Sequence, residues 1–363
     1  MNNFARALYR FLFSPPPLKP EYEKNPRGIL IIRQHNQLGD LLASSSLFRA
    51  IKSKYPEARI TLIVSPANKD AVAKNRYIDK VVVFDKGKHL WLFEFFRFIS
   101  VLRAGYDWVL VPVTVSISFT SNLMAGIAKG NLKAGPKYLD GKYNEADLFF
   151  NKKIVLDWRK QPDLHIAERI LDLVKPLGIE PAGFSPEVSF DGSDDAFARQ
   201  FLNRFEEHRS SPVIGLHTGA GKVPNRWYYK NFISLIKYLR ERHDARIYLT
   251  GSGADLPTIG KIQEGLPFTV ITCIDRSIPE VAAVIARSDL FITNDTGIMH
   301  VAGSTSTPQI SLFGPTNPFV WAPMGTNKVF LQRSDIIDNI TIDEVCEVAD
   351  RLLFLSNKRK DDV

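Results

Sequence analysis

Residues 289–318 read DLFITNDTGIMHVAGSTSTPQISLFGPTNP, and this stretch decides the fold class. An apolar run, Leu290–Thr293, passes through the polar turn Asn294–Gly297 into a segment with helical spacing of apolar residues. A second apolar run, Thr307–Phe313, leads into the rigid turn Gly314–Pro318. Strand, helix and strand in this order predict a βαβ unit in which the carboxyl ends of two parallel strands meet at one edge.

That edge is where open α/β sheets bind their ligands. Asp295 and Thr296 suit the start of a helix, where unpaired N–H groups and the helix dipole can hold a phosphate. The same residues also suit an ordinary βαβ unit with a capping acid. The quoted stretch alone leaves both interpretations open.

The same alternation extends outward through most of the chain. We expect further strands at residues 28–33, 59–64, 80–84, 107–111, 213–217 and 245–250, with helices between them. The pattern weakens over residues 112–160, which are rich in loop-forming residues, and a helix resumes over 163–176. We predict an α/β protein with two Rossmann-like, doubly wound parallel-sheet domains that face a cleft.

The domain boundaries follow from composition. We expect an N-terminal amphipathic and Pro-rich segment at 1–26, a first domain at 27–185, an interdomain linker at 186–211, a second domain at 212–340, and a C-terminal helix with a basic tail at 341–363. A chain of 363 residues exceeds what one hydrophobic core usually accommodates, which agrees with two domains.

The overall composition bounds the class of protein. An apolar content of 45% and a charged content of 24% are those of a soluble globular protein, and no run reaches the roughly 18 apolar residues of a membrane span. The net charge of +8 favours an anionic partner, and nucleic acid, acidic lipid and phosphorylated sugar all qualify. Cys273 and Cys346 lie far apart without metal-type spacing, as expected of reduced thiols in a cytosolic protein.

Two apolar helices are predicted in the first half. Residues 2–13 place Phe4, Leu8, Phe11 and their apolar neighbours on one helical face, so this segment either lies on an anionic membrane surface or forms a loosely docked tail. A second helix, predicted over 88–103, has aromatic residues on more than one face. We expect core packing rather than lipid contact for it, because exposed apolar patches are uncommon on soluble proteins.

Several common sites are excluded. A Walker phosphate loop around Lys222 would need Gly where Leu216 stands and Ser or Thr where Val223 stands. A dinucleotide fingerprint after Gly251 lacks its third glycine, because position 256 is Leu. The chain has no Asp-x-Asp triplet and no metal-type clustering, so we expect no metal and no bound cofactor.

The remaining candidates suit group transfer. Lys222, Arg226 and the backbone N–H groups after Asp295 could neutralise a phosphate leaving group. Asp40 follows the first strand and could accept a proton from an attacking hydroxyl, although an acid at a helix start needs no catalytic role.

Four motifs in chain order give these residues a family context. They are Ile31-Ile32-Arg33 with Leu38-Gly39-Asp40; His217-Thr218-Gly219-Ala220 with Arg226-Trp227; Asn294-Asp295-Thr296-Gly297 with Met299-His300-Val301-Ala302; and Leu312-Phe313-Gly314-Pro315-Thr316 with Pro318 and Trp321. Together they resemble glycosyltransferase family 9, which comprises the ADP-heptose:lipopolysaccharide heptosyltransferases and their relatives. The resemblance extends from about Gly28 to Pro323.

The resemblance implies a GT-B architecture, with an acceptor-binding first domain and a nucleotide-sugar-binding second domain. It also implies an inverting, metal-independent transfer of heptose from an ADP-linked donor to the lipid-linked inner core of lipopolysaccharide, at the cytosolic face of the inner membrane. The expected partners are therefore the nucleotide sugar and a lipid-linked oligosaccharide, with peripheral contact to an anionic membrane and without nucleic acid.

The resemblance also assigns roles. Asp40 matches the general base. With the cations Lys222 and Arg226 included, donor binding is predicted for nine residues: Thr218, Gly219, Lys222, Arg226, Asp255, Asp295, Thr296, Gly297 and His300. Asp255 matches an acid near the nucleotide ribose, and His300 is equally compatible with a structural role.

One position departs from the family. Members usually have Lys two residues before the Trp of the 218–227 loop, and this chain has Asn225. Lys222 or Arg226 could supply the charge instead. The departure keeps open a relative that uses another nucleotide sugar for a surface glycan, and a third alternative is a sugar-nucleotide-binding protein without transfer activity.

Overall fold

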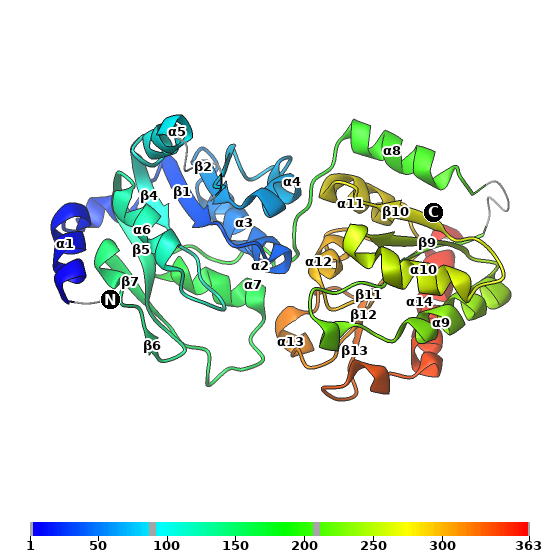
Figure 1. The fold of residues 1–363 in the computed structure, drawn as a ribbon. Helices are drawn as coiled ribbons and strands as arrows, with labels where there is room; N and C mark the ends of the chain where they lie inside the picture. The colour runs from blue at the N-terminus through cyan, green and yellow to red at the C-terminus, as the bar shows by residue number, and fades with distance from the viewer. Residues whose placement is uncertain (1–2, 86, 88–91, 206–210, 362–363) are drawn as a thin grey trace. The chain divides into compact units, whose positions relative to one another are not determined.

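A computed structural model of the protein describes residues 3–85, 87, 92–205 and 211–361 (Figure 1). The chain forms two compact units, Met1–Phe184 and Ser185–Val363. Among the described residues, no helix combines the length and the apolar character that crossing a membrane requires.

The first unit alternates strands and helices. In chain order its main elements are α1 (Asn3–Phe13), β1 (Gly28–Arg33), α2 (Leu38–Ala43), α3 (Ser45–Lys54), β2 (Arg59–Val64), α4 (Lys69–Val72), β3 (Lys80–Val83), α5 (Leu92–Leu102), β4 (Tyr106–Leu110), α6 (Phe119–Ile127), β5 (Gly130–Leu139), β6 (Lys142–Tyr143), β7 (Lys152–Leu156) and α7 (Ile166–Arg169). The strands form one sheet in the order β3-β2-β1-β4-β5-β6, and β7 also pairs with β5. The β5/β6 pair is antiparallel and the other described pairs are parallel.

The second unit repeats this plan. Its elements are α8 (Gly192–Leu202), β8 (Val213–His217), α9 (Tyr229–His243), β9 (Arg246–Gly251), α10 (Leu256–Glu264), β10 (Ile271–Ile274), α11 (Ile278–Ala286), β11 (Leu290–Asn294), α12 (Gly297–Gly303), β12 (Gln309–Leu312), α13 (Pro318–Trp321), β13 (Lys328–Leu331) and α14 (Ile342–Asp361). Its described strands are all parallel, in the order β10-β9-β8-β11-β12-β13. Helix α8 packs on α11, so part of the predicted linker belongs to this unit.

Each unit has its own hydrophobic core, built from the apolar runs of its strands. The first strand of each unit is lined almost throughout with buried residues because helices cover both faces of a parallel sheet. An acid ties the amino end of that strand to its neighbour in both units: Asp107 accepts hydrogen bonds from the Arg27 and Gly28 N–H groups, and Asp289 accepts one from Val213. The opposite strand ends are left for the loops that bind ligands.

Two predicted helices differ from the structure. The segment 163–176 is not one helix, because α7 ends at Arg169 and 3₁₀ turns follow. Core packing of the aromatic helix was wrong for most of α5: Phe98 is buried, whereas Phe93, Phe95 and Phe96 are exposed. Residues 88–91 of that predicted helix lie outside the described residues.

Candidate active site

Both sheets reverse their strand order beside their first strand. In the first unit the reversal lies between β1 and β4, and in the second it lies between β8 and β11. Loops leaving the carboxyl ends of these two strands turn away from each other and leave room for a ligand. The polar residues that the sequence singles out gather at these two positions.

In the first unit the reversal holds a cluster of three residues, which we call the Asp40 cluster. Asp40 lies in the first turn of α2, Arg33 ends β1, and Thr114 follows β4. Asp40 Oδ1 accepts a hydrogen bond from Thr114 Oγ1 at 3.1 Å and pairs with Arg33 Nη2 at 3.2 Å. No donor among the described residues contacts Asp40 Oδ2, so one carboxylate oxygen is fixed and the other can accept a proton.

Arg33 is an integral part of this cluster. Its side chain is only 4% exposed, and it also donates to the Pro112 carbonyl and to Thr114 Oγ1. Burial lowers the pKa of the Arg33 guanidinium, and the neighbouring Asp40 carboxylate opposes that shift. The pair therefore fixes the position of the carboxylate, and each charge compensates the other in a low-dielectric environment.

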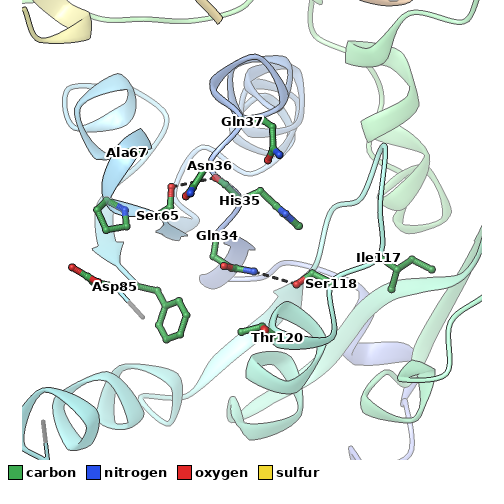
Figure 2. Close-up of a pocket in the computed structure, with 12 residues that line it drawn as sticks. Gln34, His35, Asn36, Gln37, Ser65, Ala67, Asp85, Ile117, Ser118 and Thr120 are labelled. Carbon is green, nitrogen blue, oxygen red and sulfur yellow. Dashed lines mark hydrogen bonds between the residues drawn. The ribbon is translucent and has the colours of Figure 1, made fainter. Parts of the chain in front are cut away.

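A pocket of about 690 Å³ lies beside the Asp40 cluster, and we call it the Gln34 pocket. Its walls come from the loop after β1 (34–37), the segment after β2 (65–67), the end of β3 and the start of α6. Figure 2 shows the Gln34 amide directed at Ser118, to whose hydroxyl it donates at 3.1 Å. Amide and hydroxyl groups at this density can hydrogen-bond a sugar through its own hydroxyls.

In the second unit a carboxylate again lies at the reversal, in what we call the Asp295 cluster. Asn225 Nδ2 donates to Asp295 Oδ2 at 2.7 Å and lies 3.3 Å from Thr316 Oγ1. Burial raises the pKa of Asp295, while a hydrogen bond from Thr316 and the charge of Lys222 act in the opposite direction. The residue at the position of the family lysine is thus a buried hydrogen-bond donor to Asp295.

Two buried polar atoms beside this cluster have no hydrogen-bond partner among the described residues: Thr218 Oγ1 and Asn225 Oδ1. Buried polar groups are nearly always paired, so unpaired ones mark places where a ligand or water belongs. Asn294 fixes the same loop, because its side-chain amide donates to the Thr218 and Gly219 carbonyls.

Two exposed cations extend from the same loop. Arg226 Nε donates to the Ala220 carbonyl at 2.8 Å, and its terminal nitrogens have no partner among the described residues. Lys222 is exposed and likewise has no ion-pair partner in the described part of the chain. Both charges are therefore available to an anion.

Asp255 lies against the backbone of the loop at Gly219. A Cβ placed on Gly219 would come within 2.2 Å of Asp255 Oδ1, so any larger residue there would displace this carboxylate or the loop. Asp255 Oδ2 accepts hydrogen bonds from the N–H and the hydroxyl of Ser252, which fixes the carboxylate at the end of β9. The structure thus brings Thr218, Gly219 and Asp255 together.

The residues after Asp295 divide into two groups. Thr296 and Gly297 are half-buried at the start of α12, and the Thr296 side chain does not cap the helix. His300 is 5% exposed, and its ring lies 6.2 Å from that of Trp321.

The described residues contain no group of three or more His, Cys, Asp or Glu side chains placed to hold a metal ion.

Sequence reasoning missed three participants: Arg33 and Thr114 as partners of Asp40, and Asn225 as the partner of Asp295. Arg33 stands in one of the four motifs, but the motif gives it no role. A buried charge at the end of an apolar strand is itself a signal, since an isolated charge in such a position needs an opposite charge nearby. No comparable signal marks Thr114.

A sequence model of glycosyltransferase family 9 (heptosyltransferase) matches residues 95–348, which is most of the chain. The chain belongs to glycosyltransferase family 9. The family prediction is confirmed, and the chain is a glycosyltransferase.

Individual relatives agree with this family 9 assignment. The chain is 26% identical over 317 residues to lipooligosaccharide heptosyltransferase 2 of Haemophilus influenzae, covering 84% of this chain and 88% of that protein. Among solved structures it is similar to a family 9 glycosyltransferase from Veillonella parvula, with a TM-score of 0.80, 20% identity, and coverage of 93% and 99% of the two chains.

A second similar structure is the Escherichia coli ADP-heptose lipopolysaccharide heptosyltransferase II, with a TM-score of 0.74, 20% identity, and coverage of 90% and 99%. These two structures establish the fold. The predicted GT-B class is confirmed, and this glycosyltransferase has two α/β units with predominantly parallel sheets.

Proposed function

We propose that this family 9 glycosyltransferase transfers a heptose from ADP-heptose to the inner core of lipopolysaccharide, at the cytosolic face of the inner membrane. The observation that supports it most is the Asp40 cluster, in which one carboxylate oxygen is held by Arg33 and Thr114 while the other is open. The names of the relatives, lipooligosaccharide and lipopolysaccharide heptosyltransferases, indicate the sugar and the acceptor.

In the proposed reaction an acceptor hydroxyl attacks the anomeric carbon of the heptose. The new bond joins that oxygen to the anomeric carbon, the bond from the carbon to the β-phosphate oxygen breaks, and ADP leaves with the electron pair. Asp40 Oδ2 accepts the hydroxyl proton as general base. A single displacement of this kind inverts the anomeric configuration.

The second unit would hold the donor. Lys222, Arg226 and the N–H groups at the start of α12 neutralise the leaving diphosphate in this proposal, so no metal ion is assigned. Thr218 Oγ1, which is buried and unpaired among the described residues, would hydrogen-bond the donor in this proposal. Asp255 would contact the ribose, and Asp295 and Thr296 the sugar and the diphosphate.

His300 has a different role in this proposal. His300 belongs to α12 itself, and its burial beside Trp321 suits a residue that packs this helix against α13. We therefore assign His300 to the architecture of the donor site and not to proton transfer.

The donor assignment can be tested by thermal unfolding with ADP, UDP, GDP, CMP and ADP-heptose. A ligand at about 100 times its Kd adds roughly 2.7 kcal/mol of stability, which moves the midpoint by a few degrees. We expect shifts with ADP and ADP-heptose only. A shift confined to UDP or GDP would indicate a donor linked to that nucleotide, which is compatible with Asn225 standing in place of the family lysine. The fold and the proposed base would be unaffected.

The reaction itself can be tested with ADP-heptose and an inner-core acceptor that lacks the transferred heptose. We expect a product of increased mass whose new linkage has the opposite anomeric configuration to the donor, read by NMR. Retention of configuration would contradict the single displacement. Donor binding without any product would favour the third alternative, a sugar-nucleotide-binding protein.

A further inference from the structure

Three helices of the first unit expose large apolar side chains in the described part of the chain, and we call their exposed face the helical patch. Seven residues form it, with these exposed fractions: Leu8 46%, Phe11 87%, Leu12 54%, Phe93 77%, Phe95 45%, Phe96 63% and Phe119 44%. They belong to α1, α5 and α6, which can be followed in Figure 1 as the dark blue helix and the two cyan to green helices.

These helices form one continuous layer. Helix α1 is docked through Tyr9, whose ring lies 5.8 Å from that of Phe119 in α6 and 5.9 Å from that of Phe149. Helix α6 packs in turn against α5. Because α5 and α6 are the crossovers into β4 and out of it, right-handed connections place them on the same face of the sheet.

The inward and outward faces of the helices are clearly different. On the inward face of α1, Tyr9 and Phe13 pack on the buried cluster that contains Phe149. On the inward face of α5, the ring of Phe98 lies 5.0 Å from that of Phe84. The outward positions carry Phe and Leu, whose exposure to water is unfavourable. Several large exposed apolar side chains on neighbouring helices are typical of an interaction site.

The charge of the layer identifies the partner. Helix α1 contains two arginines and no acid, α6 contains no charged residue, and α5 contains one Glu and one Arg. Cationic amphipathic helices with exposed aromatic and leucine side chains suit the surface of an anionic bilayer. A second copy of this chain would set the same cationic helix against itself in a two-fold interface.

The helical patch also borders the Gln34 pocket. Ile117, Ser118 and Thr120 line the pocket, whereas Phe119 between them contacts Tyr9 of α1. At the other wall, Phe84 lines the pocket and packs on Phe98 of α5. The pocket that would receive the sugars of an acceptor therefore adjoins the apolar layer at two places.

We propose that the helical patch docks this enzyme on an anionic phospholipid bilayer. This inference rests in part on the proposed function, because a lipid-linked acceptor presents its sugars directly above such a surface. The outer apolar side chains of α1 and α5 insert among the acyl chains close to the headgroups, and Arg10 lies with the anionic headgroups. The acceptor sugars then reach the Gln34 pocket without leaving the membrane surface.

The test is vesicle flotation with the full chain and no donor or acceptor. We expect binding to vesicles of phosphatidylcholine mixed with phosphatidylglycerol, and weaker binding to phosphatidylcholine alone or at raised salt. The triple variant Phe11→Ser, Phe93→Ser, Phe96→Ser should reduce the bound fraction at least about tenfold, because three apolar side chains lose their insertion. Arg10→Gln should reduce binding to the mixed vesicles only.

Phe354→Ser is the matched control, since Phe354 is 68% exposed but lies in α14 of the second unit. It should bind vesicles as the parent chain does. The substituted side chains are exposed, so the midpoint of thermal unfolding and its shift with ADP should be unchanged in every variant.

Undiminished vesicle binding of the triple variant would overturn the proposal, and so would equal losses in the triple variant and in Phe354→Ser. A chain that binds no vesicles but changes from dimer to monomer in the triple variant would assign the patch to a second copy instead. Because flotation uses neither substrate, its failure leaves the proposed transfer intact, and a failed transfer assay leaves vesicle binding intact.

Discussion

At the scale of single residues, the candidate site depends on carboxylates whose partners come from distant parts of the chain. Asp40 is held by Arg33 and by Thr114, and Asp295 is held by Asn225 and Thr316. In both clusters the partner fixes the carboxylate, so changes to the partners should alter function while the carboxylates themselves remain.

Thr114→Val tests the positioning of Asp40. The change removes the hydroxyl that donates to Asp40 Oδ1 and preserves the shape of the side chain. We expect kcat to fall about tenfold, the cost of a general base that is less well placed, with the KM for ADP-heptose unchanged. Steady-state kinetics provide the measurement, and Thr272→Val in β10 is the control. Equal kcat values for both variants would remove Thr114 from the account.

Asn225→Leu tests the partner of Asp295. The variant leaves a half-buried carboxylate without its 2.7 Å hydrogen bond, which costs about 1–3 kcal/mol. We expect a lower unfolding midpoint and weaker ADP binding, measured by calorimetry. Asn225→Asp should lower the unfolding midpoint and the ADP affinity more at neutral pH than at acid pH, because two ionised carboxylates face each other at neutral pH. Unaltered ADP affinity in Asn225→Leu would show that Asp295 needs no partner to bind the donor.

At the scale of elements, the loop after β8 is shaped by what it touches. Gly219 lies against Asp255, whereas a Cβ added to Gly221 would meet no other part of the described chain within 4 Å. The two glycines are two residues apart in one loop, so they form a natural pair for comparing a crowded position with an open one.

Gly219→Ala should force Asp255 away from Ser252 or shift the loop, because the added carbon would lie 2.2 Å from Asp255 Oδ1. We expect ADP affinity to fall about tenfold or more, by isothermal titration. Gly221→Ala should bind ADP as the parent chain does. If the two variants bind ADP equally, the contact between the loop and Asp255 does not shape the donor site.

His217, at the end of β8 and the start of the same loop, makes the stability of the fold depend on pH. Burial lowers its pKa from 6.5 to about 4. Between these values the unfolded chain binds more protons, so the free energy of unfolding falls as the pH falls, by about 2 kcal/mol near pH 5. His217→Gln should flatten the fall in unfolding midpoint between neutral pH and pH 5, and an unchanged slope would contradict this assignment.

The sequence predicts helices and strands better than it predicts which side chains contact each other across the fold. The apolar runs of β1 and β11 and the glycine-containing turns after them are local signals, and both strands lie where the sequence predicts them. The contact between Arg33 and Thr114 spans 81 positions, and no local pattern specifies it. The prediction for the outward face of α5 is wrong because periodicity shows that a helix has apolar faces without showing which of them meets the protein core.

At the scale of the whole molecule, each unit has its own core and its own reversal of strand order, beside which its candidate site residues lie. ADP alone should therefore protect backbone amides in the second unit, at the loops around Thr218, Asp255 and Asp295, in a hydrogen-exchange experiment. The Asp40 loop should exchange as it does without nucleotide. Equally strong protection of the Asp40 loop would contradict the proposal that the donor binds the second unit while the base lies in the first.

The central claim is that Asp40 accepts the proton, and Asp40→Asn tests it most directly. The amide keeps the size of the side chain and can still contact Thr114, but it cannot act as a base. We predict that kcat for heptose transfer falls by about 10²–10⁴ while the Kd for ADP stays within a factor of about two. A variant that keeps near-parental kcat with intact ADP binding would contradict the account.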